Sequence, residues 1–292
     1  SISKDYDLYR VFLNLIPENQ ERFLDICSGN RGVRILYDAY FKEIFNPDIV
    51  PQRLIRLLSL LLDKNITEIR SLRNSSSLIE DNQTLMILDI VVKLDDGSLV
   101  NVEVQKYGYA FPGQRAACYS SDLLLRQYGQ IRNKKKEDFS YADMSPVYSI
   151  IFMETSPHEF TQYPSCYIFR SSQKTVPETT LEFLQNYVFI PLDNFRKFVN
   201  NKKQRGLSDL DAWMLFLSSD EPEDIMYLTE KHPEFRPMYE QLFMICRNEG
   251  RMLEMFSEEL RMMDNNTVKL MIDKMKEELE DSKKELEDSK KE

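Results

Sequence analysis

The chain has 292 residues, of which 42% are hydrophobic and 29% charged, and its formal net charge is −10. This composition is typical of a globular protein, and the length suits one large domain with appendages or two domains. The sequence contains neither an apolar run long enough to span a membrane nor a signal peptide, so we expect a cytoplasmic protein without a membrane partner. The acidic balance counts against a general nucleic-acid binder, which usually shows a basic surface.

Helices are predicted first along the chain. Residues 1–34 contain short aromatic and leucine clusters, which predict a helical extension packed on the core. Residues 33–45 follow a 3.6-residue hydrophobic period and predict a helix with Asp38 and Lys42 on one face. Residues 50–62 predict a second, strongly apolar helix. Its two arginines, Arg53 and Arg56, are expected on the solvent side.

Residues 66–72 predict a first strand, and residues 84–105 predict a hairpin of two further strands. Before the turn of this hairpin the residues are apolar on both faces, with the single exception of Asp89. After the turn, valines alternate with polar residues that include Glu103 and Gln105, which is the period of a β-strand. The connecting Asp-Asp-Gly fits a three-residue hairpin loop with glycine in the left-handed conformation.

This loop predicts the register of the hairpin. If Leu94 pairs with Ser98, Asp89 lies opposite Glu103, a few ångströms away on the same face. Like charges at that distance repel unless a cation lies between them, and Mg²⁺ is the usual cation because it takes hard oxygen ligands. The alternative is a carboxylate pair on a solvated face, although a lone acid such as Asp89 is costly in an apolar strand.

A long helix is predicted to open at Gly113 and Gln114, downstream of the hairpin. Its stripe of polar residues consists of Arg115, Tyr119, Asp122 and Arg126. Basic residues cluster near and after its end, where they either bind a phosphate backbone or form a solvated loop. They are Arg126, Arg132, Lys134, Lys135 and Lys136.

The remaining elements complete an α/β fold, in which helices flank a mixed sheet whose central hairpin carries the acids. Strands are predicted over residues 145–153, 166–170 and 188–192, and the pattern is helical from residue 209. Residues 264–292 contain ELEDSKK twice at a period of seven, which predicts a charged heptad helix. This tail either joins subunits of a homo-oligomer as a weak coiled coil or is solvated.

Several site chemistries are not signalled by the sequence. The two histidines, His158 and His232, are not at zinc-ligand spacing from the cysteines, and the four dispersed cysteines contain no C-x-x-C pair. There is no nucleophile elbow, phosphate-binding loop or dinucleotide fingerprint. A metal held by carboxylates is the chemistry that remains.

The order of motifs resembles a known family. The pattern of Asp89, a DG-containing turn and E-x-Q resembles the core of the PD-(D/E)XK nuclease superfamily. It looks more like the branch of recombination-promoting (Rpn) nucleases and transposases, in which Gln commonly replaces the Lys of E-x-K. YDAYFKEIFNP at residues 37–47 and FPGQRAACYSSDLLLRQYGQ at residues 111–130 are similar to the helices of that branch on either side of the hairpin.

The resemblance covers about residues 36–265 and implies a restriction-endonuclease-like core over residues 35–205, a helical region over 206–263 and the tail from 264. It implies an endonuclease that cleaves double-stranded DNA with Mg²⁺ or Mn²⁺. The implied metal ligands are Asp89, Glu103 and the backbone carbonyl of Val104.

Other residues take supporting roles under this resemblance. Gln105 would orient the water or a phosphate oxygen, and Asp38 would stand at the edge of the site. Lys106 projects from the opposite face of its strand, so it cannot replace the missing lysine. The implied contacts to the site or to DNA phosphates are Gln114, Arg115, Arg126, Lys134 and Lys135.

Two other functions stay open at this point. A catalytically weak DNA-binding or assembly protein of the same fold is favoured by the acidic balance and by Gln105 in place of lysine. An α/β interaction protein with its acids on the surface is the third alternative. Binding of Mg²⁺ or Mn²⁺ separates them, because only the nuclease requires metal at Asp89 and Glu103.

Overall fold

The fold was analysed in a computed structural model that describes residues 6–72, 90–108, 111–171 and 173–257, without positions 174, 178, 180, 249 and 256. The predicted heptad tail from residue 264 and the strand residues 84–89, Asp89 among them, lie outside the described residues. Of the helices within these ranges, none is both long and apolar enough to cross a membrane.

The described strands form one mixed sheet in the order β1-β2-β3-β4-β6-β5. The first three strands and the β5–β6 edge pair antiparallel, whereas β3, β4 and β6 run parallel in the middle. Parallel central strands are buried on both faces, which agrees with the nearly continuous apolar sequence of β4. Their bounds are β1 Ile69–Ser71, β2 Ile90–Leu94, β3 Leu99–Tyr107, β4 Val147–Thr155, β5 Phe169–Arg170 and β6 Gln185–Pro191.

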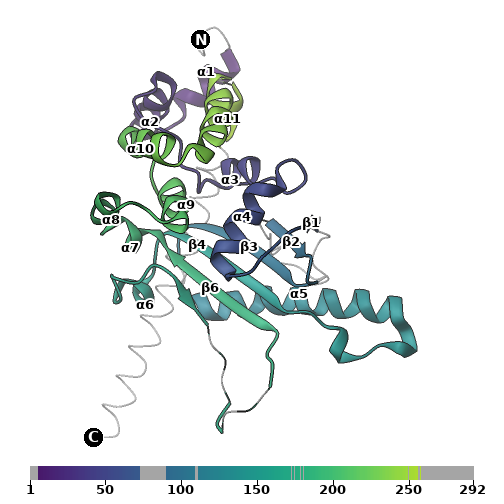
Figure 1. Ribbon diagram of the computed structural model, residues 1–292. Coiled ribbons are helices and arrows are strands. Elements are labelled where there is room, and N and C mark those ends of the chain that lie inside the picture. Colours follow the sequence, from purple (N-terminus) through teal and green to yellow (C-terminus); the bar gives the residue numbers. More distant parts are fainter. Residues whose placement is uncertain are drawn as a thin grey trace, which may run out of the picture.

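Helices cover both faces of this sheet, as predicted for an α/β fold. One face is crossed by the long helix α5, where Phe160 of α6 also packs, and most of the other helices gather on the opposite side and above the sheet (Figure 1). They are α1 Tyr6–Leu13, α2 Pro17–Ser28, α3 Asp38–Ile44, α4 Pro51–Leu62, α5 Pro112–Lys135, α6 His158–Thr161, α7 Leu192–Arg196, α8 Val199–Arg205, α9 Asp209–Ser218, α10 Pro222–Lys231 and α11 Arg236–Arg247.

The main hydrophobic core lies on the face of the sheet away from α5. There, Val100 and Val102 of β3 belong to one cluster with the buried residues of α3, α4 and α9. Aromatic rings hold these helices together, since Phe45 lies 5.8 Å from Trp213 and Phe41 lies 6.3 Å from Phe152 between ring centroids. Two smaller apolar clusters occupy the face beneath α5. The sheet is therefore covered on both sides.

The register of the central hairpin is the one that its loop predicts. Val92 faces Val100, and Ile90 faces Val102. Leu94 donates its backbone N–H to Ser98 at 2.8 Å, and Gly97 adopts a left-handed φ of 87°. Glycine suits this position because it has no Cβ to clash in that conformation.

Several predicted elements differ from the observed ones in their bounds, two of them for a clear local reason. The helix predicted over residues 33–45 begins only at Asp38, because Tyr37 is extended and the apolar residues before it are buried outside a helix. The strand predicted over residues 166–170 is confined to β5, since Cys166 donates its N–H to Tyr163 in a turn.

The helix predicted over residues 50–62 is confirmed as α4, but Arg53 does not lie on its solvent side. Arg53 is half-buried and donates to the backbone oxygen of Ile44 at 2.9 Å and to Gln241 at 2.6 Å. Burial lowers the pKa of this guanidinium. The side chain therefore joins α4 to α11, whereas Arg56 is exposed as predicted.

Candidate active site

The candidate site is a column of polar side chains on β3 that faces α5. Asn101, Glu103 and Gln105 are 0%, 6% and 7% exposed. Alternation of valine and polar residues is typical of a half-exposed strand. Here it marks a strand buried on both faces, because α5 crosses over the polar side. Glu103 of the hairpin therefore lies in the interior of the protein.

Glu103 is the centre of this column. Its Oε1 accepts a hydrogen bond from Gln105 Nε2 at 2.8 Å and lies 3.5 Å from Nη2 of Arg115 on α5. Burial raises the pKa of Glu103 in spite of the opposing effects of Arg115 and Gln105. These two partners therefore do not fully compensate the buried carboxylate.

The polar stripe predicted on the long helix is present on α5. The Arg115 guanidinium lies over the Tyr119 ring at 4.9 Å from its centroid. About two turns further, Arg126 Nε lies 2.7 Å from Oδ2 of Asp122, which is 9% exposed. The stripe therefore contains two arginines with defined partners, of which Arg115 lies at the site itself.

A buried polar row adjoins Glu103 beneath α5. Asn101 of β3 is the register partner of Ser149 on β4, and both are at most 1% exposed. Both amide atoms of Asn101 and the hydroxyls of Ser149 and Ser120 have no hydrogen-bond partner among the described residues. Such groups are costly to bury in an apolar layer. The sequence signalled Asn101 only by the strand period, and it did not signal the two serines.

Other predicted site residues lie elsewhere. On α3, Asp38 pairs with Lys42 at 2.8 Å, the surface pairing that its spacing also suggested. The buried residues of α3 belong to the core on the face away from α5, so a role of Asp38 beside Glu103 stays a prediction. Val104 lies on β3 opposite Phe152 of β4, directly between Glu103 and Gln105 in the chain.

The predicted DNA-contacting residues are spread along α5. Gln114 is exposed in the first turn of the helix, near Arg115. Lys134 is exposed in the last turn, and the neighbouring Lys135 forms an ion pair with Asp143. The structure thus brings Arg115 to Glu103, whereas the lysines occupy the far end of the helix.

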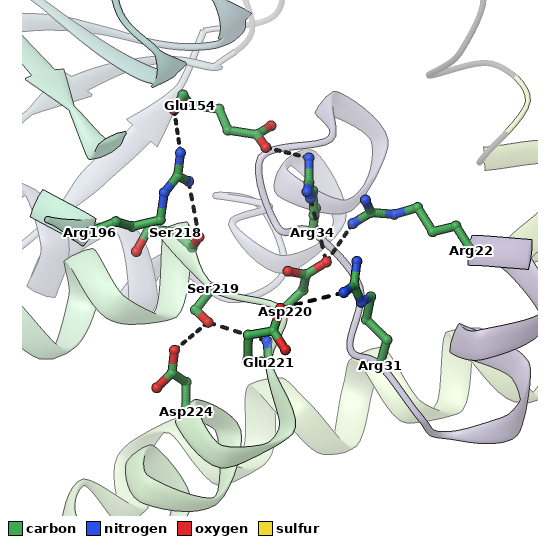
Figure 2. A network of polar contacts seen from close by, with 10 residues as sticks. All are labelled: Arg22, Arg31, Arg34, Glu154, Arg196, Ser218, Ser219, Asp220, Glu221 and Asp224. Atoms are coloured by element: carbon green, nitrogen blue, oxygen red, sulfur yellow. Dashed lines mark hydrogen bonds and ion pairs between the residues drawn. The ribbon is translucent and has the colours of Figure 1, made fainter. Parts of the chain in front are cut away.

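Lys106 lines a different part of the molecule, as its strand position predicts. It borders a polar cavity of about 510 Å³ at the carboxyl ends of β3 and β4. Figure 2 shows the charged network beside this cavity. Arg34 contacts both Glu154 and Asp220, and Arg22 donates to Asp220 at 2.5 Å.

Sequence reasoning did not single out this network. One signal was available, because Glu154 follows a buried apolar run, and the carboxyl ends of parallel strands are where ligands bind in open α/β sheets. Most of the charges of the network are paired with one another. The network therefore connects α2, β4 and the loop between α9 and α10.

A second group of potential metal ligands lies far along the chain. In the described part of the chain, Asp209, His232 and Glu234 are the three side chains of this kind whose ligand atoms lie within 4.8 Å of one another. Arg56 already pairs with Asp209 at 3.2 Å and with Glu234 at 3.3 Å. The two carboxylates share this guanidinium, so the group is explained as an ion-pair cluster.

Fold and site together define an α/β protein of the restriction-endonuclease-like type, in which a central hairpin carries a buried E-x-Q under a long helix. The model of the PD-(D/E)XK nuclease family transposases matches residues 35–283, which is most of the chain. The chain belongs to this family, as the order of its motifs predicted. Comparison with curated proteins and with solved structures finds no match in either.

Proposed function

We propose that this protein is a Mg²⁺-dependent DNA endonuclease whose centre is Glu103, with Asp89 as its partner across the hairpin. The observation that carries the proposal is the buried Glu103 of β3, bonded to Gln105 and adjacent to Arg115. The register of β2 and β3, continued by one residue, supports Asp89 as the residue opposite Glu103. Family membership supports the reaction class.

The residues of the site fit a divalent cation. Glu103 supplies a hard carboxylate oxygen, and Asp89 and the Val104 carbonyl would supply two more. Burial raises the pKa of Glu103 and Arg115 opposes this rise only in part, so a bound cation would further stabilise the charged carboxylate. Bound Mg²⁺ would supply an activated water and neutralise charge on the phosphate.

Arg115 has a defined part in this proposal. Gln105 brings no positive charge, whereas lysine at the same place would stabilise the charge that develops on the phosphate. Arg115 brings a guanidinium to 3.5 Å from Glu103, from α5 instead of β3. We therefore assign to Arg115 the contact with the scissile phosphate, and to Gln105 the orientation of Glu103.

The direct test compares plasmid nicking with Mg²⁺ by the intact protein and by the variants Asp89→Ala and Glu103→Gln. We expect both variants to lose nicking and the heat of Mg²⁺ binding in calorimetry. Glu68→Gln is the matched control, because Glu68 is exposed and pairs only with Arg70 in the described chain. Equal nicking by the intact protein and Asp89→Ala would contradict the assignment.

One observation favours a second function, a catalytically weak DNA-binding protein of the same fold. Glu103 already has Arg115 as a cationic neighbour, which partly serves in place of a metal ion. This alternative predicts that the protein retains duplex DNA, while calorimetry shows no Mg²⁺ or Mn²⁺ binding and plasmid stays intact. The same two measurements therefore decide between the two functions.

A further inference from the structure

The far end of α5 carries an aromatic cluster next to basic side chains. We call this region the α5 tip. Figure 1 shows α5 running past the sheet and turning back through a loop toward β4. The tip consists of Tyr128, Arg132, Lys134, Lys135, Lys136, Phe139 and Tyr141.

Three aromatic rings of the tip pack on one another. Phe139 contacts Tyr128 and Tyr141 edge-on, each at 5.3 Å between centroids. Tyr141 is nearly parallel to Tyr128, with an angle of 14° and a centroid distance of 6.3 Å. Tyr128 and Phe139 are partly buried by this packing, whereas Tyr141 is 77% exposed. One face of this ring is therefore open.

The loop holds Tyr141 in a defined orientation. Ser140 and Asp143 form a capping box around the short helical turn Tyr141–Asp143, and Lys135 forms an ion pair with Asp143. Arg132 lies over the Tyr128 ring at 5.5 Å from its centroid. The open face is thus preorganised, and binding to it would cost little ordering entropy.

The charge around the ring favours a polyanion. Between residues 123 and 136 the chain has five basic residues and no acid, in a protein whose net charge is −10. Lys134 and Lys136 are exposed at the end of α5, seven and five residues before Tyr141 in the chain. The exposed acids Glu137 and Asp138 follow, so the positive charge is concentrated on the α5 side of the loop.

An open aromatic face beside basic side chains is the arrangement that binds unpaired nucleotides. Every base has a π-face that can stack on an aromatic ring, while lysines and arginines follow the backbone. A base inside a duplex has both faces occupied by its neighbours, so it offers Tyr141 nothing to stack on. The tip therefore fits an unpaired segment better than a continuous duplex.

We propose that the α5 tip binds unpaired nucleotides of DNA through stacking on Tyr141, so that the substrates of the enzyme are junctions between duplex and single strand. This inference rests on the proposed nuclease function and names its substrate class. Along α5, Arg115 at the site and Arg132 at the tip lie about 25 Å apart, from a rise of 1.5 Å per residue. That length corresponds to about seven base-pair steps of duplex.

The test measures fluorescence anisotropy with labelled DNA in EDTA, which prevents cleavage. The three probes are a single strand, its blunt duplex and a fork that combines both. We expect the fork and the single strand to bind more tightly than the blunt duplex. Tyr141→Ala should weaken both by roughly 5-fold or more, from the value of stacking per base, and leave the duplex unchanged. Tyr141→Phe should retain the affinity.

Two controls separate stacking from other effects. Tyr6→Ala removes another tyrosine ring of similar exposure, 79%, outside the tip and should change nothing. Lys134→Ala combined with Lys136→Ala should weaken all three probes and reduce the salt dependence of binding, because phosphate contacts are lost. Loss of stacking should have no such effect on the salt dependence.

The outcomes also separate this inference from the nuclease proposal. If Tyr141→Ala binds the fork as tightly as the intact protein does, the inference is wrong, whether or not the protein nicks plasmid. If Tyr141→Ala loses fork binding while Asp89→Ala still nicks plasmid, the tip is supported and the assignment of the nuclease site fails. Preference for the blunt duplex over the fork would also overturn the inference.

Discussion

At the scale of single residues, the side chains that contact Glu103 come from two elements, β3 and α5. Gln105 comes from the same strand and was visible in the E-x-Q spacing. Arg115 comes from α5 and lies 3.5 Å from the carboxylate. Under the proposed function, Arg115 on the helix would supply the positive charge that the lysine of E-x-K would carry on the strand. This shift in position makes a charge-relocation experiment possible.

We predict that Arg115→Gln lowers the rate of Mg²⁺-dependent nicking by about 10- to 100-fold, because a preorganised cation at the phosphate is lost. Combining Arg115→Gln with Gln105→Lys should recover part of that rate, since the charge returns on the strand. The measurement is single-turnover cleavage, with thermal unfolding of each variant to verify folding. If the double variant cleaves no faster than Arg115→Gln alone, a cation on the strand does not replace Arg115 and the prediction is contradicted.

The sequence singled out Glu103 and Gln105 as candidate site residues, but it did not predict that they are buried. Strand alternation describes which residues share a face, and it does not say whether another element covers that face. The element that covers this face is α5, which also buries Asn101 and Ser149. Arg22 and Asp220 could not be connected from sequence either, because they are far apart in the chain and meet only through the packing of α2.

At the scale of elements, the Asp-Asp-Gly loop was predictable because a short loop permits few conformations. It set the register of β2 and β3, and through it the place of Glu103. The start of α3 was not predictable in the same way. The hydrophobic period also continues through residues 33–37, where the chain is largely buried but forms a turn that ends in the extended Tyr37. Prediction from local sequence is therefore most reliable for short segments whose conformations are few, such as this loop.

The role of Gly97 in that loop can be tested with a second glycine as control. Gly97→Ala should destabilise the protein by about 1–2 kcal/mol, because φ is 87° and an added Cβ would lie 2.8 Å from Ser145 Oγ. Gly129→Ala in α5 should stabilise it by roughly 0.5–1 kcal/mol, since alanine is the better helix former. No atom lies within 4 Å of a Cβ at that second position. Urea unfolding measures both changes, and a neutral Gly97→Ala would contradict the assigned strain.

A buried carboxylate at the start of α9 predicts a pH dependence of stability. Asp211 accepts hydrogen bonds from Tyr167 and Lys202, each at 2.7 Å, and from Ser208 at 2.8 Å. Burial alone would raise the pKa of Asp211, but its three donors outweigh burial and lower it. The unfolded chain therefore binds a proton more readily than the folded protein, so the carboxylate stabilises the fold above the unfolded pKa of about 3.9.

Asp211→Asn should accordingly lower the free energy of unfolding by about 2–4 kcal/mol at neutral pH. This difference from the intact protein should shrink as the pH falls through the lowered pKa of Asp211. Urea unfolding between neutral and acidic pH checks both statements. Asp209→Asn in the same turn is the control, because its pair with Arg56 is exposed and should contribute little. If the difference in unfolding free energy between the intact protein and Asp211→Asn does not change with pH, the lowered pKa of Asp211 is contradicted.

At the scale of the whole molecule, charged residues connect the N-terminal helices to the sheet. Asp220, between α9 and α10, accepts from Arg22 of α2 at 2.5 Å and lies 3.5 Å from Nε of Arg34. Its backbone oxygen accepts from Gly32 at 2.8 Å. Glu154 at the end of β4 completes the connection through Arg34, as Figure 2 shows. One aspartate thus joins three parts of the chain.

Asp220→Asn should therefore loosen α2 more than the sheet. We expect a loss of about 1–3 kcal/mol in the free energy of unfolding, because two partly buried guanidinium groups lose their shared carboxylate. In hydrogen exchange, the amides of α2 around Phe23 and Ile26 should exchange faster, while those of β3 and β4 keep their protection.

The neighbouring Glu221 provides the control for this prediction, since its pair with Arg31 spans 3.6 Å between exposed side chains. Exposed pairs contribute little, so Glu221→Gln should leave both stability and exchange within error of the intact protein. If Asp220→Asn and Glu221→Gln behave alike, the buried network does not hold α2. If β3 and β4 lose protection together with α2, the network stabilises the fold as one cooperative unit, and the N-terminal helices do not open separately.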